Sequence, residues 1–230
     1  MIEPIDPRTL TNEELQDAVE AVSLTKEKRT GEMKGRTCMN GSKQQDILGF
    51  FESVALPTIS LETLLAPLII DAHEGRCVGI FDVPCAYLHA EMPESKRVAM
   101  RLQGQFIDLM CEANPKYKDY IQIVNGKKIL YLRVLMALYG GIQSELLWYN
   151  LFTEYLLKLG FVINPYDRCI ANKLINVKQC TTAWYFDDVK VSHKDKAVVR
   201  LFQEVTRTHY TKITSIFYTK KHSTITLSKH

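Results

Sequence analysis

Two β-forming segments separated by only two acidic residues constrain the fold of this chain most strongly. The uncharged run TTAWYF (181–186) precedes Asp187 and Asp188, and VKVS (189–192) follows them. β-Branched and aromatic residues favour strands, and such a short connection predicts a tight antiparallel hairpin. Because two like charges at its tip repel each other, the acidic pair has to be solvated or bound to a cation.

Short strands and helices are mixed along the rest of the chain. Ser60 can cap one mostly apolar helix, which Pro67 should kink or split, and a second helix ends before Gly160. Because these elements do not alternate strictly as βαβ units, the pattern favours the α+β class. Besides the hairpin, the expected strands are 77–83, 129–134 and 170–175, and the expected helices are 60–73, 144–159 and 195–208.

Composition places the chain among ordinary globular proteins. Of its 230 residues 46% are hydrophobic and 24% are charged, and the net charge of +3 is too small to predict binding to nucleic acid or membranes by itself. No apolar run reaches the ~18 residues of a membrane helix, and no secretory signal is visible. The expected location is therefore the cytoplasm, with the nucleus as the alternative.

Charge is distributed unevenly along the chain. Residues 1–20 carry six acidic groups and one basic group, whereas the sign reverses over residues 25–43. This contrast sets residues 1–20 apart as an acidic N-terminal extension of the remaining chain, 21–230. The six cysteines are scattered without the paired spacing of a zinc site, so reduced thiols are the better interpretation.

A third carboxylate could join the acidic pair. Asp82 ends the apolar run CVGIF, at the carboxyl end of a buried strand. Three carboxylates on two adjacent strands can hold two Mg²⁺ ions, which stabilise the attacking and leaving oxygens of a phosphoryl transfer. Taken alone, the pattern favours the simpler interpretation of an exposed turn at Asp187 and Asp188 and a structural aspartate at position 82.

Five sequence blocks resemble, in their order and spacing, the reverse transcriptase domain of copia-type retrotransposons. FDVPCAYLHAEMP (81–93) is similar to the first palm motif, ALYGGIQSELLWY (137–149) to the second, and YFDD (185–188) to the Tyr-x-Asp-Asp polymerase signature. KEKRTGEMKGRTCMNGSKQ (26–44) resembles the basic fingers block, and PTISLETLLAPLIIDAHEG (57–75) resembles the helix before the first motif. The resemblance implies a right-hand polymerase with fingers and a ferredoxin-like palm sheet covered by helices.

The resemblance also implies roles for individual residues. Asp82, Asp187 and Asp188 would be the catalytic residues that bind two Mg²⁺ ions, with Asp82 and Asp187 as the main ligands, Asp188 beside them, and Mn²⁺ as the alternative metal. Tyr87 would lie under the incoming sugar and exclude a 2′-hydroxyl, which selects deoxynucleotides. The reaction would be RNA-directed DNA synthesis from deoxynucleoside triphosphates on an RNA or DNA template-primer, without a membrane; the resemblance does not imply an oligomeric state.

Three further residues would contact the nucleotide or template. The resemblance gives this role to Gln143, and it favours Lys28 and Arg36 as the fingers residues that clamp the triphosphate. Lys26, Arg29 and Lys34 are close alternatives. Lys and Arg donors neutralise the charge that develops on the leaving pyrophosphate. Without the resemblance, Tyr87 and Gln143 would be read as residues at the edge of the core, and His89 as a structural histidine.

The sequence departs from the family pattern at several points. Phe186 replaces a usual Val, Pro84 replaces a frequent Lys, and residues 145–147 lack a frequent Arg. The segment KITSIFYTKKHSTITLSKH (212–230) does not resemble the primer-gripping turn that precedes the thumb and ribonuclease H domain. These departures predict a truncated domain with the thumb largely missing.

Two alternative functions follow from the same residues. A catalytically inactive retrotransposon relic would keep the basic segments and bind nucleic acid without polymerising nucleotides. An unrelated metal-dependent phosphohydrolase could also be built on Asp82 and the acidic pair, although the sequence has no Gly-x-x-x-x-Gly-Lys phosphate loop.

Overall fold

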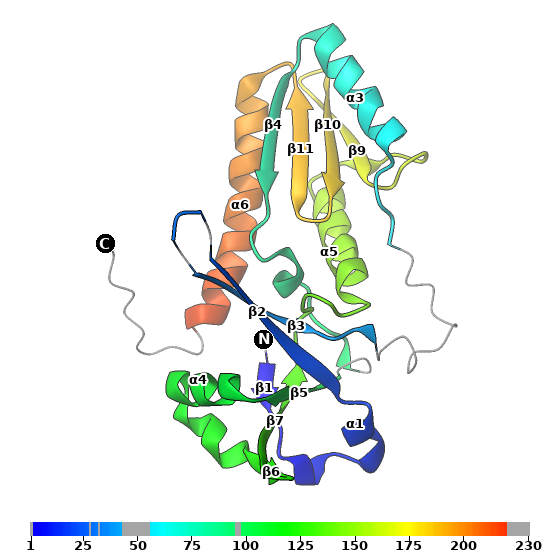
Figure 1. Ribbon diagram of the computed structural model, residues 1–230. Coiled ribbons are helices and arrows are strands. Elements are labelled where there is room, and N and C mark those ends of the chain that lie inside the picture. Colours follow the sequence, from blue (N-terminus) through cyan, green and yellow to red (C-terminus); the bar gives the residue numbers. More distant parts are fainter. Residues whose placement is uncertain (1, 28, 32, 43–55, 95–97, 220–230) are drawn as a thin grey trace. The chain divides into compact units, whose positions relative to one another are not determined.

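The computed structural model describes residues 2–27, 29–31, 33–42, 56–94 and 98–219, and these fold into a mixture of sheets and helices (Figure 1). The α+β class expected from the sequence is therefore confirmed. The chain divides into two compact units. Unit 1 comprises Met1–Ala55 and Ala90–Leu147, and unit 2 comprises Leu56–His89 and Trp148–His230.

Unit 1 is built on a sheet with the strand order β1-β7-β5-β2-β3, in which β6 also pairs with β7. Only β2 and β5 run parallel; the other pairs are antiparallel. The strands are β1 (Ile2–Pro4), β2 (Val19–Glu27), β3 (Met33–Met39), β5 (Ala99–Gln103), β6 (Gln122–Val124) and β7 (Lys127–Val134). The helices are η1 (Pro7–Thr9), α1 (Asn12–Gln16), α4 (Gln105–Ala113) and η4 (Pro115–Tyr120).

The acidic first residues of the chain take part in this unit. Strand β1 pairs with β7, and a capping box between Thr11 and Glu14 starts α1 because each side chain accepts from the other's backbone N–H. Ile5 and Leu10 are buried together with Ile129 and Tyr131 of β7. The segment 2–20 is thus attached to the sheet by both hydrogen bonds and apolar packing.

Unit 2 is built on an entirely antiparallel sheet with the order β4-β11-β10-β9-β8. The strands are β4 (Cys77–Asp82), β8 (Val162–Ile163), β9 (Ile170–Ile175), β10 (Lys178–Tyr185) and β11 (Asp188–His193). The helices are α3 (Leu61–Glu74), η2 (Ala86–His89), α6 (Lys196–Thr219) and α5 (Ser144–Lys158), which belongs to this unit from Trp148 onward.

Helix α6 packs directly on β4 and β11 of this sheet (Figure 1). The approach is close at Gly79, where an added Cβ would lie 2.7 Å from side-chain atoms of Val199 and Gln203. Phe81 and Val189 face the same side and belong to the apolar core. Because side chains alternate along a strand, the residues between them, including Ile80, emerge on the opposite face of the sheet.

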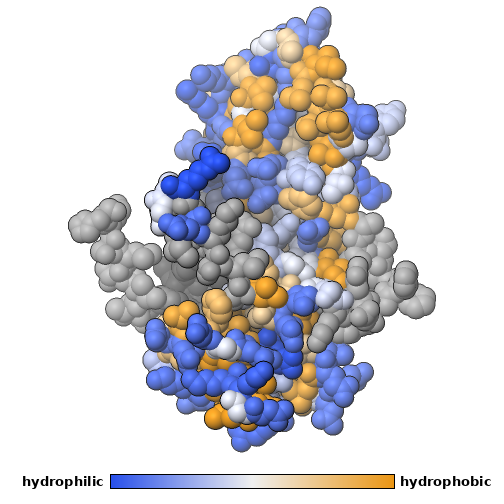
Figure 2. Space-filling view, viewed as in Figure 1, coloured by the Kyte–Doolittle hydropathy of each residue, from blue (hydrophilic) through white to orange (hydrophobic). Residues whose placement is uncertain are grey.

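Helix α3 shows how far the sequence pattern predicts local structure. Ser60 caps it by accepting from the Thr63 N–H, and Gly75 ends it in the left-handed conformation with φ 63°. Pro67 lies inside the helix, which continues as one element, so the expected split at Pro67 does not occur. The helix is apolar on much of its outer surface, where Leu61 and Ile69 are 68% and 67% exposed (Figure 2).

No helix in the described part of the chain has both the length and the apolar character that a bilayer crossing requires.

Candidate functional site

The acidic hairpin forms at the expected position, but its turn is one residue earlier than expected. Tyr185 at the end of β10 lies opposite Asp188 at the start of β11, so the two linking residues are Phe186 and Asp187. The expectation that Asp187 and Asp188 form the link is therefore wrong. Phe186 adopts φ 53°, which a β-forming residue rarely does, and the sequence pattern gives no sign of this conformation.

Neighbouring groups hold this turn in place. The indole N–H of Trp148 donates a 2.8 Å hydrogen bond to the carbonyl oxygen of Phe186, and Trp148 itself is only 1% exposed. The backbone N–H of Val83 donates a 2.9 Å bond to the carbonyl oxygen of Asp187. The left-handed conformation costs of order 1 kcal/mol for a residue with a Cβ, and these two bonds offset that cost.

Asp82 and Asp188 lie directly opposite each other in the register of β4 and β11. Residues that are directly opposite in an antiparallel pair point to the same face, with Cβ atoms about 5 Å apart. Both side chains are exposed, and Asp187 in the adjoining turn is half-buried. The expectation that the hairpin lies beside the strand ending at Asp82 thus agrees with the structure, while the catalytic roles of the three residues stay predictions.

The donor set has the chemistry of a divalent-cation site. Carboxylate oxygens are the ligands that Mg²⁺ prefers, and two of these carboxylates come from facing positions on adjacent strands. In the side-chain positions of the described residues, however, no three His, Cys, Asp or Glu side chains lie close enough together to hold a metal ion. The residue types and backbone positions therefore fit such a site, and the side chains would have to converge on the ion.

Tyr87 lies on η2, which follows β4 after a short turn. Its side chain is half-buried and packs against the core of unit 2. His89, at the end of the same element, is 7% exposed, and its Nε2 lies 3.0 Å from the carbonyl oxygen of Pro84. Burial lowers the pKa of His89, which keeps the ring neutral near pH 7. This environment is that of the structural histidine expected from the sequence.

The remaining predicted nucleotide-binding residues belong to unit 1. Gln143 is 8% exposed and directly precedes α5, where its carbonyl oxygen accepts from the Leu147 N–H. Arg36 lies on β3 opposite Leu24 of β2, and these two strands pair antiparallel. Lys28 lies outside the described residues. The contacts of Gln143, Arg36 and Lys28 with a nucleotide stay predictions.

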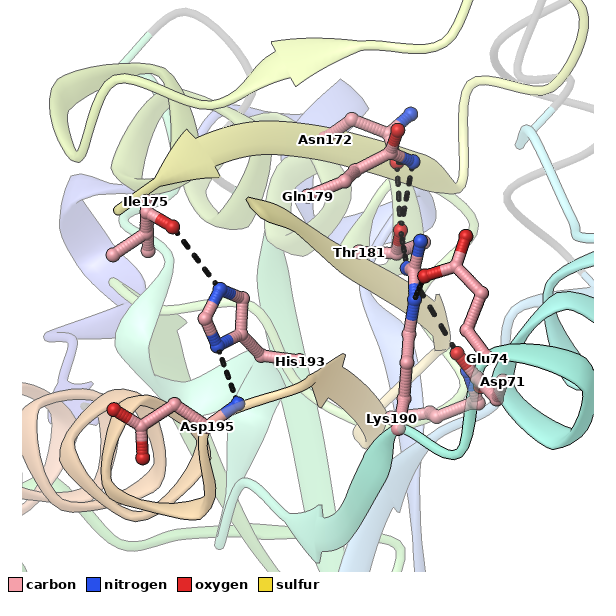
Figure 3. A network of polar contacts seen from close by, with 10 residues as sticks. Asp71, Glu74, Asn172, Ile175, Gln179, Thr181, Lys190, His193 and Asp195 are labelled. Atoms are coloured by element: carbon pink, nitrogen blue, oxygen red, sulfur yellow. Dashed lines mark hydrogen bonds and ion pairs between the residues drawn. The ribbon is translucent and has the colours of Figure 1, made fainter. Parts of the chain in front are cut away.

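Sequence reasoning missed a buried ionic network on the sheet of unit 2 (Figure 3). The Lys190 Nζ lies 2.5 Å from an Asp71 carboxylate oxygen, and the two side chains are only 8% and 4% exposed. The Arg76 guanidinium lies 4.0 Å from the other oxygen of Asp71 and 3.0 Å from Glu74. The only sequence signal was an acid in the otherwise apolar stretch LAPLIIDA.

This network lies on the sheet face that carries the candidate carboxylates. Lys190 follows Asp188 by two positions in β11, so both side chains emerge on the same side. The Lys190 ammonium is directed to Asp71 of α3, which fastens that helix to the sheet.

Comparison with known proteins identifies a family for most of the chain. A family model described as "Reverse transcriptase (RNA-dependent DNA polymerase)" matches residues 19–228. No curated protein matches the chain. Because the matched region covers nearly the whole sequence, the chain belongs to this reverse transcriptase family.

Proposed function

We propose that this member of the reverse transcriptase family is a template-directed DNA polymerase domain of the copia type, with its catalytic centre at the acidic hairpin of unit 2. The observation that carries the proposal is the pairing of Asp82 with Asp188 on one face of the sheet, beside Asp187 in the turn. Such a grouping concentrates negative charge at the end of two strands, where a divalent cation is the natural counter-charge.

Asp82, Asp187 and Asp188 would hold two Mg²⁺ ions. When bound, such ions stabilise the attacking primer 3′-hydroxyl and the leaving pyrophosphate. The protein contributes positioning: the hairpin turn is anchored by Trp148, and the strand that carries Asp82 is bonded to it through Val83. Rigid placement of this kind matters because small displacements of reacting groups cost large factors in rate.

The other predicted residues bind and select the nucleotide. Lys28 and Arg36 clamp the triphosphate, and Gln143 contacts the nucleotide or the template. Tyr87 excludes the 2′-hydroxyl sterically. The partners are a template-primer and deoxynucleoside triphosphates, and the proposed location is the cytoplasm.

A primer-extension assay with an RNA template, a DNA primer, Mg²⁺ and all four deoxynucleoside triphosphates tests this proposal. Asp82→Asn and Asp188→Asn should each abolish extension, since each removes one of the facing carboxylates. Glu154→Gln is the matched control, because Glu154 is an exposed acid of unit 2 that pairs with Lys158 on its own helix. Extension that survives both aspartate substitutions would refute the proposal.

One observation favours a second candidate function, binding of nucleic acid without polymerisation. In the described residues, the three carboxylates are not gathered closely enough to hold an ion. For this candidate, the same preparation would bind template-primer in a filter assay and yet give no extension at any Mg²⁺ or Mn²⁺ concentration.

A further inference from the structure

Unit 2 contains a pocket of ≈ 250 Å³ between α3 and the strands β9 and β10. Pro67 and Ile70 of α3 and Ile170 of β9 contribute apolar lining. Asn172 and Gln179 contribute polar groups, together with Thr181 and Arg76. The volume is below the ~300–1,000 Å³ typical of pockets for drug-sized ligands, so a single small ring system suits it better than a whole nucleotide.

The polar side of the pocket is organised by hydrogen bonds among its own side chains (Figure 3). Gln179 donates to the side-chain oxygen of Asn172 at 2.8 Å, and Thr181 donates to the same oxygen at 2.9 Å. The Arg76 Nη1 donates to the Thr181 hydroxyl at 3.2 Å. These bonds hold the two amide side chains in fixed orientations on the sheet.

The same bonds leave two groups of opposite type unused. The Asn172 Nδ2 is a donor and the Gln179 Oε1 is an acceptor, and neither has a partner among the described residues. A carboxamide donor next to a carboxamide acceptor matches the edge of a nucleobase, as in the paired contacts of Asn or Gln with adenine. The apolar residues Pro67 and Ile70 suit the flat faces of such a ring.

Charge around the pocket argues against a phosphate. The Arg76 guanidinium is 4% exposed and already lies against Asp71 and Glu74. Asp167 adds a further carboxylate to the pocket lining, where it accepts from Thr63 and the Cys169 N–H. Acidic side chains around the pocket are at least as numerous as basic ones. The pocket therefore favours a neutral nucleobase over an anionic group such as phosphate.

An aromatic ring stands at the pocket and is almost completely exposed. Tyr166 lines it and is 93% exposed, while its backbone N–H is fixed by a 2.8 Å bond to the Asn164 side chain. Exposed aromatic rings of this kind serve as stacking platforms for the unpaired bases of single-stranded nucleic acid.

We propose that this pocket, defined by Tyr166, Asn172 and Gln179, binds one unpaired nucleobase of a bound nucleic-acid strand. The proposal rests on the proposed function for the presence of that strand. Thr181 lies four residues before Tyr185 on β10, on the same sheet face as Asp82 and Asp188, and therefore about 13 Å from the hairpin. This distance is short enough for one bound strand to reach both places.

The test measures binding of two fluorescently labelled single-stranded DNA oligonucleotides of equal length, one of adenines and one with abasic sugars, at one salt concentration. The full chain should bind the adenine strand more tightly. Tyr166→Ala should reduce that advantage by about 5- to 150-fold, the range measured for loss of one base–aromatic stack. Gln179→Leu should reduce it as well, since it removes the free acceptor.

Leu174→Thr is the matched control, because Leu174 is an exposed residue of β9 that does not line the pocket. It should leave the difference in affinity between the adenine and the abasic oligonucleotide unchanged. Adenosine added in excess distinguishes a free nucleoside from a base within a strand: if the pocket recognises the strand, millimolar adenosine should not displace the oligonucleotide.

Equal binding of the two oligonucleotides by the full chain, or an advantage that survives both Tyr166→Ala and Gln179→Leu, would overturn the proposal. Displacement by adenosine would overturn the assignment to a strand. Primer extension is measured separately on the same preparations. Because the proposed extension depends on Asp82 and Asp188 and not on the pocket, failure of the pocket proposal can be distinguished from failure of the proposed polymerase function.

Discussion

Replacing Lys190 by Met should strongly destabilise unit 2. The substitution keeps most of the side-chain volume but removes the ammonium that lies 2.5 Å from Asp71, and both side chains are buried. An uncompensated buried charge costs about 3–5 kcal/mol. We expect the lower end, about 3 kcal/mol, because the Arg76 guanidinium remains 4.0 Å from Asp71.

Tryptophan fluorescence during urea unfolding measures this loss in the right part of the molecule. The chain has two tryptophans. Both Trp148 and Trp184 lie in the core of unit 2, so their emission reports on that unit. With a denaturant slope of about 1.5 kcal/mol/M, the unfolding midpoint of Lys190→Met should fall by about 2 M urea.

The double variant Asp71→Leu/Lys190→Met is the control for the electrostatic reasoning. It removes both charges together, so its free energy of unfolding should return to within about 1 kcal/mol of the original protein. A single variant Lys190→Met that unfolds within about 0.5 kcal/mol of the original would refute the argument that the buried ion pair fastens α3 to the sheet.

Three further predictions concern the same unit. Gly79→Ala should cost about 1–3 kcal/mol, because its Cβ would meet Val199 and Gln203 at 2.7 Å; urea unfolding checks this, and an unchanged midpoint would contradict the close packing of α6. Burial lowers the pKa of His89 below its ordinary 6.5, so the unfolded chain binds a proton more readily than the folded one, and the free energy of unfolding falls as the pH drops below about 6.5. In unfolding experiments from pH 7 to 5, His89→Gln should make this fall less steep. An equally steep fall in the variant would refute the prediction. Tyr87→Ala should admit ribonucleotides if the domain polymerises, which matched incorporation assays with ribo- and deoxynucleotides measure; an unchanged preference would mean that another residue selects the sugar.

The hairpin illustrates how much of the site was predictable from the sequence. The uncharged β-forming runs on both sides of Asp187 and Asp188 predicted two paired strands, and β10 and β11 are those strands. The turn itself was misplaced by one residue, because the left-handed φ of Phe186 depends on a hydrogen bond from Trp148, which lies 38 positions away in the chain. Local propensity contains no information about such a distant partner.

The buried ion pair was unpredictable for a related reason. In VKVS, Lys190 stands between two valines and reads as a side chain on the solvent-facing side of a strand. It is buried because α3 lies over this part of the face and supplies Asp71. The pocket likewise depends on residues from three separate segments. The register of β9 with β10 brings two of them together, and side-chain contacts of Thr63 and Arg76 bring the third.

A single-nucleotide incorporation assay shows whether the domain copies a template. The full chain is mixed with Mg²⁺, one deoxynucleoside triphosphate at a time, and four RNA template–DNA primer pairs that differ only in the first unpaired template base. We expect incorporation of the complementary nucleotide on each template and none with Asp188→Asn. Incorporation that ignores the template base, or that persists undiminished in Asp188→Asn, would contradict it.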